Sequence, residues 1–152
     1  TLTYTKNSAV FKSDEYTIYT RLITGNYFPY QKMFTDGEIN TCASRTALIG
    51  AMTRAKMCTE EKQPAVFQIE DDVLNISIRD KLADYQEQVP LQETVCKSIR
   101  LGFDSKLVLE TLKAFTCDNI ALGFTSPRTP MIVEAEDSDM KAMVLPVAIR
   151  EA

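Results

Sequence analysis

The sequence predicts an α+β fold in which two helices pack on antiparallel sheets and a β-α-β-β-β plan occurs twice. Three observations lead to this prediction. Runs of β-branched and aromatic residues alternate with turn sequences, two stretches carry apolar residues at helical spacing, and one order of elements recurs from about residue 37. A length of 152 residues is enough for one ordinary domain with its own core and short for two.

The first part of the chain predicts short strands. Its runs are rich in Thr, Tyr, Val and Ile, and residues 6–8 and 13–15 between them are good turn sequences. Gly25 then ends the pattern, and a connector that contains Pro29 follows. The strands are expected at residues 2–5, 9–12 and 16–23.

Two similar units follow the connector. In each unit a strand leads through a Ser and a basic residue into a helix, and three further strands come after it. Ser44 and Asp104 are the expected N-caps of the two helices. The first unit is expected to have a strand near 38–42, a helix at 44–58 and strands near 64–69, 73–78 and 82–91. The second is expected to have a strand at 97–103, a helix at 105–115 and strands near 118–124, 130–136 and 141–149.

Each predicted helix has one apolar face when its residues are placed about 100° apart. The opposite sides carry basic residues, which this pattern alone interprets most simply as solvated faces. The residues expected to be buried are Ala47, Leu48, Ala51, Met52 and Ala55 in the first helix and Val108, Leu109, Leu112 and Phe115 in the second. Those expected to point outward are Thr46, Gly50, Thr53 and Met57 in the first helix and Lys106, Glu110 and Lys113 in the second.

Composition narrows the classes of function. The chain has no His, which excludes imidazole-based catalytic triads and His-containing metal sites. Its net charge of −4 argues against a free-standing nucleic-acid binder, and no apolar run approaches the roughly 20 residues that cross a bilayer. The four cysteines have neither a zinc spacing nor a C-x-x-C pair, so buried free thiols are expected at Cys42, Cys58, Cys96 and Cys117.

Three local motifs carry little chemical specificity. Ser138 and Lys141 fit the S-x-x-K spacing of some serine acyltransferases, but they lie in an acidic turn at 134–139 rather than at a helix start. Asn75 matches a glycosylation sequon inside an expected strand. The acidic residues 70–72 are interpreted as a hairpin tip rather than as a metal site. No catalytic residue, metal site or cofactor is assigned, and a hydrolase using Ser138 and Lys141 is a remote alternative.

Four segments resemble bacterial DNA polymerase sliding clamps, in the same order and with matching spacing. They are Tyr19-Thr20-Arg21-Leu22-Ile23, the connector Gly25-Asn26-Tyr27-Phe28-Pro29-Tyr30-Gln31-Lys32-Met33-Phe34, then Leu101-Gly102-Phe103-Asp104 and Val144-Leu145-Pro146-Val147. The resemblance spans the whole chain and implies the DNA-clamp fold. It identifies residues 1–24 as the C-terminal strands of the family's middle domain and residues 25–152 as its third, C-terminal domain.

The resemblance also implies a replication processivity factor that is not an enzyme. Clamp subunits pair head to tail as a cytoplasmic homodimer, and the ring encircles duplex DNA with helices lining the hole. An acidic chain can then stay on DNA, because retention is topological and only the inner wall needs to be basic. The residues expected to face DNA without reading its sequence are Arg45, Arg54, Lys56, Lys106 and Lys113. The alternative is a clamp-like α+β interaction module that forms no ring.

A second activity implied by the resemblance is the binding of short peptides from polymerases, the clamp loader and repair proteins. Such peptides carry a Gln and an apolar Leu-Phe-like end, and they fit a cleft between the middle and third domains. The third-domain wall of that cleft would comprise Pro29, Lys32, Met33, Asp104, Leu107, Arg128, Pro130, Met143, Val144, Leu145, Pro146 and Val147. Met57 and Cys58, at the end of the first helix, are expected at the subunit interface.

Overall fold

The computed structural model describes residues 1–58, 63–79, 84–135 and 137–149, and the chain divides into two compact units. The first unit, Thr1–Gln31, holds an antiparallel sheet in the order β1-β2-β3. Its strands are β1 (Leu2–Tyr4), β2 (Ser8–Lys12) and β3 (Thr17–Arg21). The three short strands expected at the start of the chain are confirmed.

Cross-strand pairing gives this small sheet one apolar face. Phe11 of β2 pairs with Leu2 of β1 and with Ile18 of β3, so the three side chains lie on the same side of the sheet. Phe11 is 46% exposed, Leu2 56% and Ile18 51%. Within residues 1–31, then, the apolar face of this sheet is left largely uncovered.

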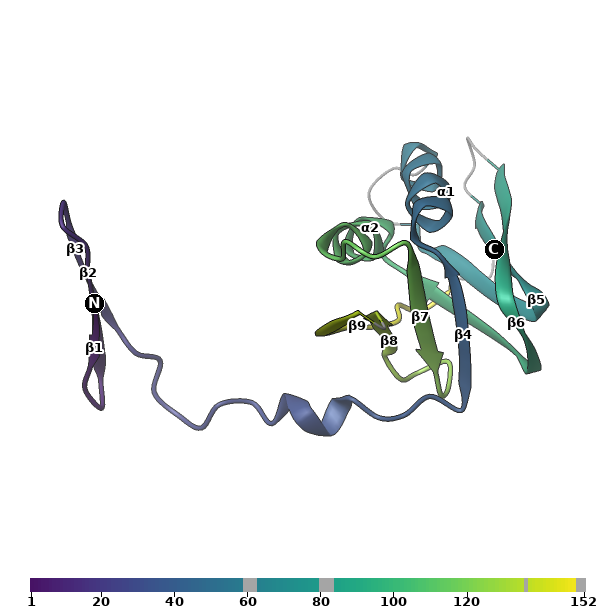
Figure 1. The fold of residues 1–152 in the computed structure, drawn as a ribbon. Helices are drawn as coiled ribbons and strands as arrows, with labels where there is room; N and C mark the ends of the chain where they lie inside the picture. Colours follow the sequence, from purple (N-terminus) through teal and green to yellow (C-terminus); the bar gives the residue numbers. More distant parts are fainter. Residues whose placement is uncertain (59–62, 80–83, 136, 150–152) are drawn as a thin grey trace. The chain divides into compact units, whose positions relative to one another are not determined.

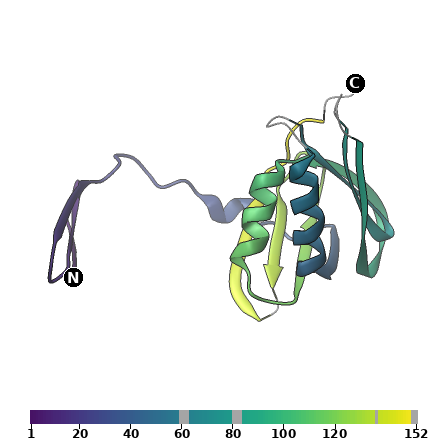
Figure 2. The ribbon, with the colours of Figure 1, turned by 90° about the horizontal axis from the view of Figure 1, so that it is seen from above.

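The second unit, Lys32–Ala152, is built on antiparallel strands in the order β5-β6-β4-β7-β8-β9. These strands are β4 (Ile39–Ser44), β5 (Ala65–Arg79), β6 (Asp84–Phe103), β7 (Asn119–Phe124), β8 (Met131–Ala135) and β9 (Ser138–Val144). The helices are α1 (Arg45–Met57) and α2 (Ser105–Ala114), and a 3-10 turn, η1 (Tyr30–Met33), comes before β4. Figures 1 and 2 show α1 and α2 side by side against the strands, which confirms the predicted α+β class.

The pairing of the strands reflects the predicted repeat. The strand that leads into each helix pairs with the strand that follows the other helix: β4 pairs with β7 through Ala43 and Ile120, and β6 pairs with β5 through Phe103 and Ala65. The strand that leads into each helix also has an equivalent contact with the end of its own repeat. Those contacts are Ala43 with Leu91 and Gly102 with Val147.

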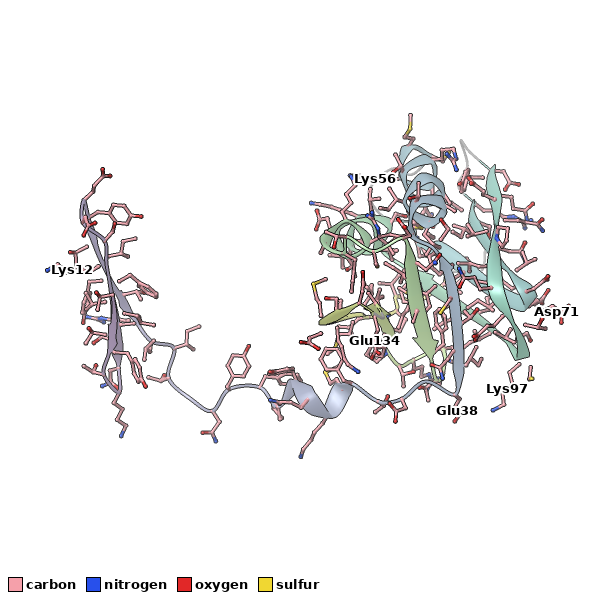
Figure 3. All side chains as sticks on the ribbon, viewed as in Figure 1. Lys12, Glu38, Lys56, Asp71, Lys97 and Glu134 are labelled. Atoms are coloured by element: carbon pink, nitrogen blue, oxygen red, sulfur yellow. The ribbon has the colours of Figure 1, made fainter. Side chains whose placement is uncertain are left out.

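The strand boundaries differ from the prediction between the two helices. The strands expected at 64–69 and 73–78 are one continuous strand, β5, and those expected at 82–91 and 97–103 both lie within β6, although residues 82–83 fall outside the described residues. The acidic segment 70–72 is therefore not a hairpin tip but an irregularity inside β5, where the register with β6 shifts (Figure 3 labels Asp71). Asp71 has φ of 51°, a conformation that Asp tolerates better than most residues.

The helices bury the predicted faces and begin at the predicted caps. Ser44 accepts a hydrogen bond from the backbone N–H of Ala47, and Asp104 caps α2 in the same way. All the residues expected to be buried are buried except Ala47, which is half-buried. The four cysteines form no disulfide, as expected, but the prediction that they are buried is wrong, because Cys96 is exposed and the other three are half-buried.

Candidate functional site

The two helices carry an excess of basic side chains. Their sequences contain five basic residues and one acidic residue, Glu110. Lys113 is exposed, and the Nζ atom of Lys106 lies 4.0 Å from a carboxylate oxygen of Glu110 one turn further along α2. A contact of this length between exposed groups is weak, so Lys106 and Lys113 keep charges that a phosphate can approach.

Arg45 and Lys56 stand at opposite ends of α1. The Nε atom of Arg45 donates to the carbonyl of Cys117 at 2.5 Å, and its backbone N–H donates to the carbonyl of Asp118 at 2.9 Å. Both bonds attach the start of α1 to the segment that follows α2. Lys56 is exposed in the last turn of α1 (Figure 3).

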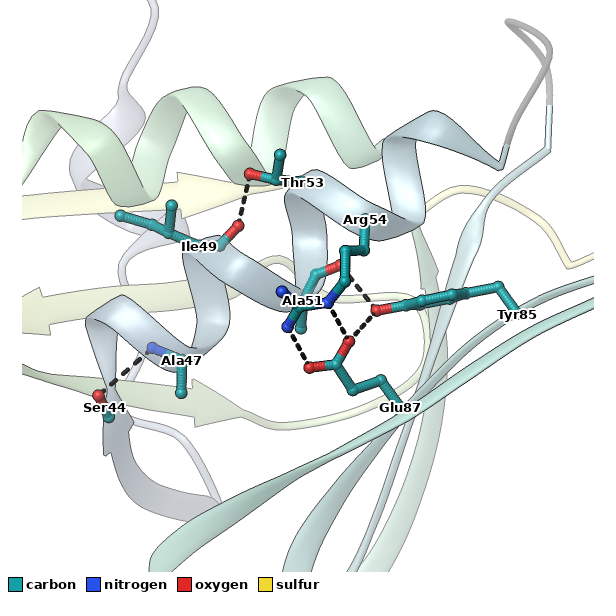
Figure 4. Close-up of polar contacts among 8 residues, drawn as sticks. All are labelled: Ser44, Ala47, Ile49, Ala51, Thr53, Arg54, Tyr85 and Glu87. Carbon is teal, nitrogen blue, oxygen red and sulfur yellow. Dashed lines mark hydrogen bonds and ion pairs between the residues drawn. The ribbon is translucent and has the colours of Figure 1, made fainter.

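Arg54 is bound to the neighbouring strand β6. Its Nε atom donates to Glu87 Oε2 at 2.8 Å, and its Nη2 atom donates to Glu87 Oε1 at 2.5 Å, which makes a bidentate ion pair. The hydroxyl of Tyr85 lies 2.9 Å from the carbonyl oxygen of Ala51 and also contacts the Glu87 carboxylate, so its single proton serves one of the two (Figure 4). We call these side chains the Arg54–Glu87–Tyr85 network.

The network is stable in its charged form at neutral pH. The hydrogen bond from Arg54, with a further one from Tyr85, lowers the pKa of Glu87, and burial together with the contact to Glu87 raises the pKa of Tyr85. Because the folded-state pKa of Glu87 is depressed, its contribution to stability is present at neutral pH and is lost as the pH falls through that pKa. Arg54 is thus already paired, although its DNA-facing assignment stays a prediction.

Met57 is the last residue of α1, and Cys58 is its C-cap. Met57 is 82% exposed, whereas Cys58 is half-buried and its backbone N–H donates to the carbonyl of Ala55 at 3.0 Å. Single exposed apolar residues are common on protein surfaces, so the exposure of Met57 leaves it available for a contact with another subunit without requiring one. The subunit-interface assignment of both residues stays a prediction.

The start of α2 lies beside the C-terminal segment of the described chain. The backbone N–H of Val147 donates to the carbonyl of Gly102 at 2.8 Å, two residues before the Asp104 cap. The Asp104 carboxylate accepts two backbone N–H groups of α2, at 2.8 and 3.2 Å. Leu107, Leu145 and Val147 are 50%, 57% and 41% exposed. Exposed apolar side chains therefore occur next to a capping carboxylate, and a mostly apolar lining with a few polar groups is common in ligand sites.

Two neighbouring residues of the predicted wall lie on opposite faces of strand β9. Met143 pairs with Ile132 of β8, and the neighbouring Val144 pairs with Met131. Val144 is 3% exposed and belongs to the core, so its side chain is not part of an exposed wall. The sequence motif could not separate these neighbours, because successive strand residues point to opposite faces. Of the other predicted wall residues, Pro29, Lys32 and Arg128 are exposed, and Met33, Pro130 and Pro146 are half-buried.

A shallow hollow that the sequence did not predict is lined by Ile132 of β8, the cross-strand partner of Met143. Its volume is about 220 Å³, and its lining residues are Thr35, Asp36, Gly37, Asn40, Ala121, Leu122, Gly123, Ile132 and Glu134. Gly37 permits the close approach of the connector to β7, since a Cβ there would lie 2.8 Å from the backbone nitrogen of Phe124. The lone glycine was the only signal in the sequence, and it does not say which strand the segment contacts.

The S-x-x-K motif has no catalytic geometry. Ser138 and Lys141 lie within β9, where an odd spacing puts their side chains on opposite faces. Lys141 Nζ donates to Glu134 at 2.7 Å, and the Ser138 hydroxyl oxygen accepts from the backbone N–H of Met140 at 3.1 Å. Nothing in this arrangement supports the hydrolase alternative.

The described part of the chain has neither a metal-binding group nor a membrane-spanning helix. Across the ranges that the structure describes, no three Cys, Asp or Glu side chains gather into a metal-binding group. Over the same ranges, no helix combines the length and the apolar character needed to span a bilayer.

Comparisons with known proteins agree with this arrangement. The chain is similar to the beta sliding clamp of Streptococcus pneumoniae serotype 4, with 22% identity over 151 residues that cover 97% of this chain and 40% of the relative. The beta sliding clamp of Staphylococcus aureus strain Mu50 is 24% identical over 149 residues, covering 95% and 40%. Among solved structures, a DNA polymerase sliding clamp from Caulobacter crescentus matches with a TM-score of 0.89 at 14% identity, covering 97% of this chain and 40% of that one.

The share of each protein that is matched decides whether the match shows the family or only the fold. The chain spans about 40% of the length of the curated relatives that it matches. The structural likeness at low identity shows the shared fold. A family model described as DNA polymerase III beta subunit, C-terminal domain, matches residues 34–148, which is most of the chain. The chain therefore belongs to the DNA polymerase III beta subunit family and carries that family's C-terminal domain.

Proposed function

We propose that this chain is the C-terminal part of a sliding clamp, a non-catalytic processivity factor of DNA replication. In the full-length form, two subunits pair head to tail in the cytoplasm and encircle duplex DNA. The observation that carries the proposal is the charge of the two helices, which hold five basic residues and one acidic residue in a chain whose net charge is −4. A basic inner wall on an acidic protein suits a ring that holds DNA by topology rather than by affinity.

The basic helix residues would contact DNA weakly and without sequence preference. Lys106 and Lys113 are the best placed. Among the described residues, the only ion pair that involves either of them is the weak contact of Lys106 with Glu110. Lys56 and Arg45 extend the basic surface to the two ends of α1. Contacts of long exposed side chains to phosphates position a protein on DNA and carry no base information, which is what free sliding requires.

The second part of the proposal is a peptide-binding wall. The exposed apolar side chains of Leu107, Leu145 and Val147, beside the Asp104 cap, form its centre, and Met143 continues it along β9. Partner peptides of polymerases, the clamp loader and repair proteins would place their apolar end here. The opposite wall would come from the preceding domain of the full-length protein.

We further propose that residues 1–24 are the last strands of that preceding domain, and that the third domain begins at residue 25. The apolar face formed by Leu2, Phe11 and Ile18 supports this proposal, because a sheet of three short strands with an uncovered apolar face needs more protein to bury it. Most of the chain's buried apolar residues lie instead in the second unit.

Light scattering of the full-length protein that contains this chain tests the ring. Two subunits per particle are expected at micromolar concentration, and replacement of exposed Met57 by Asp is expected to shift the particle toward the monomer, because a buried unpaired charge opposes association. Lys113→Asp, on the exposed face of α2, is the matched control and is expected to leave the dimer intact. A wild-type monomer at that concentration would support the alternative, an interaction module that forms no ring.

A further inference from the structure

The Arg54–Glu87–Tyr85 network joins two successive turns of α1 to the beginning of β6. Tyr85 and Glu87 are two residues apart on β6, so their side chains lie on the same face of that strand. Tyr85 reaches the Ala51 carbonyl, and Glu87 reaches the Arg54 guanidinium nearly one turn later (Figure 4). The network therefore fixes both the backbone and a side chain of the last half of the helix.

Gly50 makes room for this arrangement. A Cβ at Gly50 would lie 3.2 Å from Nη2 of Arg54, which is closer than ordinary side-chain contacts. Glycine in the interior of a helix is less stable than alanine. The space that this glycine leaves is occupied by the guanidinium that pairs with Glu87.

The network lies one turn before the exposed end of α1. Buried Met52 and Ala55 hold the side of the helix that faces the sheet, while Met57 is 82% exposed. An apolar side chain contributes most to association when its backbone is already fixed, because ordering it during binding costs conformational entropy. The bidentate ion pair between Arg54 and Glu87 of β6 provides such fixing. The Tyr85 hydroxyl adds a contact to the Ala51 carbonyl oxygen or to Glu87, and Met57 stays exposed.

Resting on the proposed function, we propose that Arg54, Glu87 and Tyr85 position the end of α1 for subunit pairing, and that Arg54 serves this role instead of contacting DNA. A phosphate that recruited Arg54 would have to displace two hydrogen bonds to Glu87, at 2.8 and 2.5 Å. Lys106 and Lys113 require no comparable exchange. Arg54 is therefore a positioning residue of the subunit interface.

Subunit dissociation constants and DNA binding of the full-length protein separate these roles. Glu87→Gln keeps the size and shape of the side chain, Arg54→Gln shortens it, and each removes one charge. Each is expected to raise the subunit dissociation constant by about two- to fivefold, the range for exposed ion pairs. The double variant is expected to be no weaker than either single variant, because both remove the same pair. In a Met57→Ala background the effect of Glu87→Gln is expected to disappear, which a purely structural pair would not produce.

The salt dependence of affinity for a short duplex supplies the second readout. Arg54→Gln is expected to leave the slope of log affinity against log salt unchanged, whereas the control Lys113→Gln is expected to reduce it, since each lost phosphate contact removes about 0.9 from the slope. A dimer that is insensitive to Glu87→Gln, or a reduced slope for Arg54→Gln, would overturn the inference while leaving the ring intact. A wild-type monomer would instead refute the proposed function and, with it, the inference.

Discussion

Replacement of Phe103 by Ala is expected to lower the free energy of unfolding by about 3–5 kcal/mol, the range for large-to-small changes of buried aromatic residues. Phe103 is fully buried, and its ring meets that of Phe67 edge-on with centroids 5.2 Å apart. It is also the last residue of β6 and pairs with Ala65 of β5. A cavity at this position would loosen both long strands and the start of α2 together.

Urea unfolding followed by circular dichroism measures this effect. The matched control is Leu107→Ala, which removes an apolar side chain that is 50% exposed on the neighbouring helix. It is expected to change the free energy of unfolding by less than about 1 kcal/mol, because half-exposed surface positions contribute little. Similar losses for the two variants would contradict the assignment of Phe103 to the centre of the core.

Replacement of Gly102 by Val is expected to destabilise the second unit by about 1–3 kcal/mol, as overpacking does, and to displace the C-terminal segment from α2. A Cβ at this position would lie 2.8 Å from the carbonyl oxygen of Val147 and 3.0 Å from a side-chain carbon of Ile149. The segment cannot move away without stretching the hydrogen bond from Val147 to Gly102. The proposed peptide-binding wall would lose its alignment with Leu107 as a result.

Hydrogen exchange at the Val147 amide reports this displacement directly. The amide is expected to lose protection in Gly102→Val and to keep it in Arg100→Val, which places the same side chain at an exposed position of the same strand. Full protection of the Val147 amide in Gly102→Val would show that this segment does not lie as close to Gly102 of β6 as described.

Local patterns were sufficient to predict the helices and their caps. The apolar spacing in α1 and α2 identified the buried faces, and Ser44 and Asp104 have the side chains that accept backbone N–H groups at a helix start. Both features depend on residues within one or two turns of each other. The sequence alone therefore contains the information needed to place them.

Features that depend on distant pairing were not predictable in the same way. The acidic residues around Asp71 resemble a turn in composition, but β5 continues through them because β6 supplies a partner on both sides of the irregularity. The resemblance placed Arg54 among the residues expected to face DNA, yet its partner Glu87 lies 33 positions away on another element. Likewise, neighbouring wall residues such as Met143 and Val144 separate onto opposite faces only once β9 is known to be a strand.

The proposed ring is tested most directly by measuring whether the protein is released from circular DNA when the circle is cut. The full-length protein would be loaded by its clamp loader onto nicked circular duplex, purified away from free protein in high salt, and then treated with an enzyme that linearises the circle. High salt would screen the proposed phosphate contacts of the helix lysines, so a clamp held by topology is expected to stay on the circle and to leave after linearisation. Equal retention on circular and linear DNA, or complete release from the circle in high salt, would contradict it.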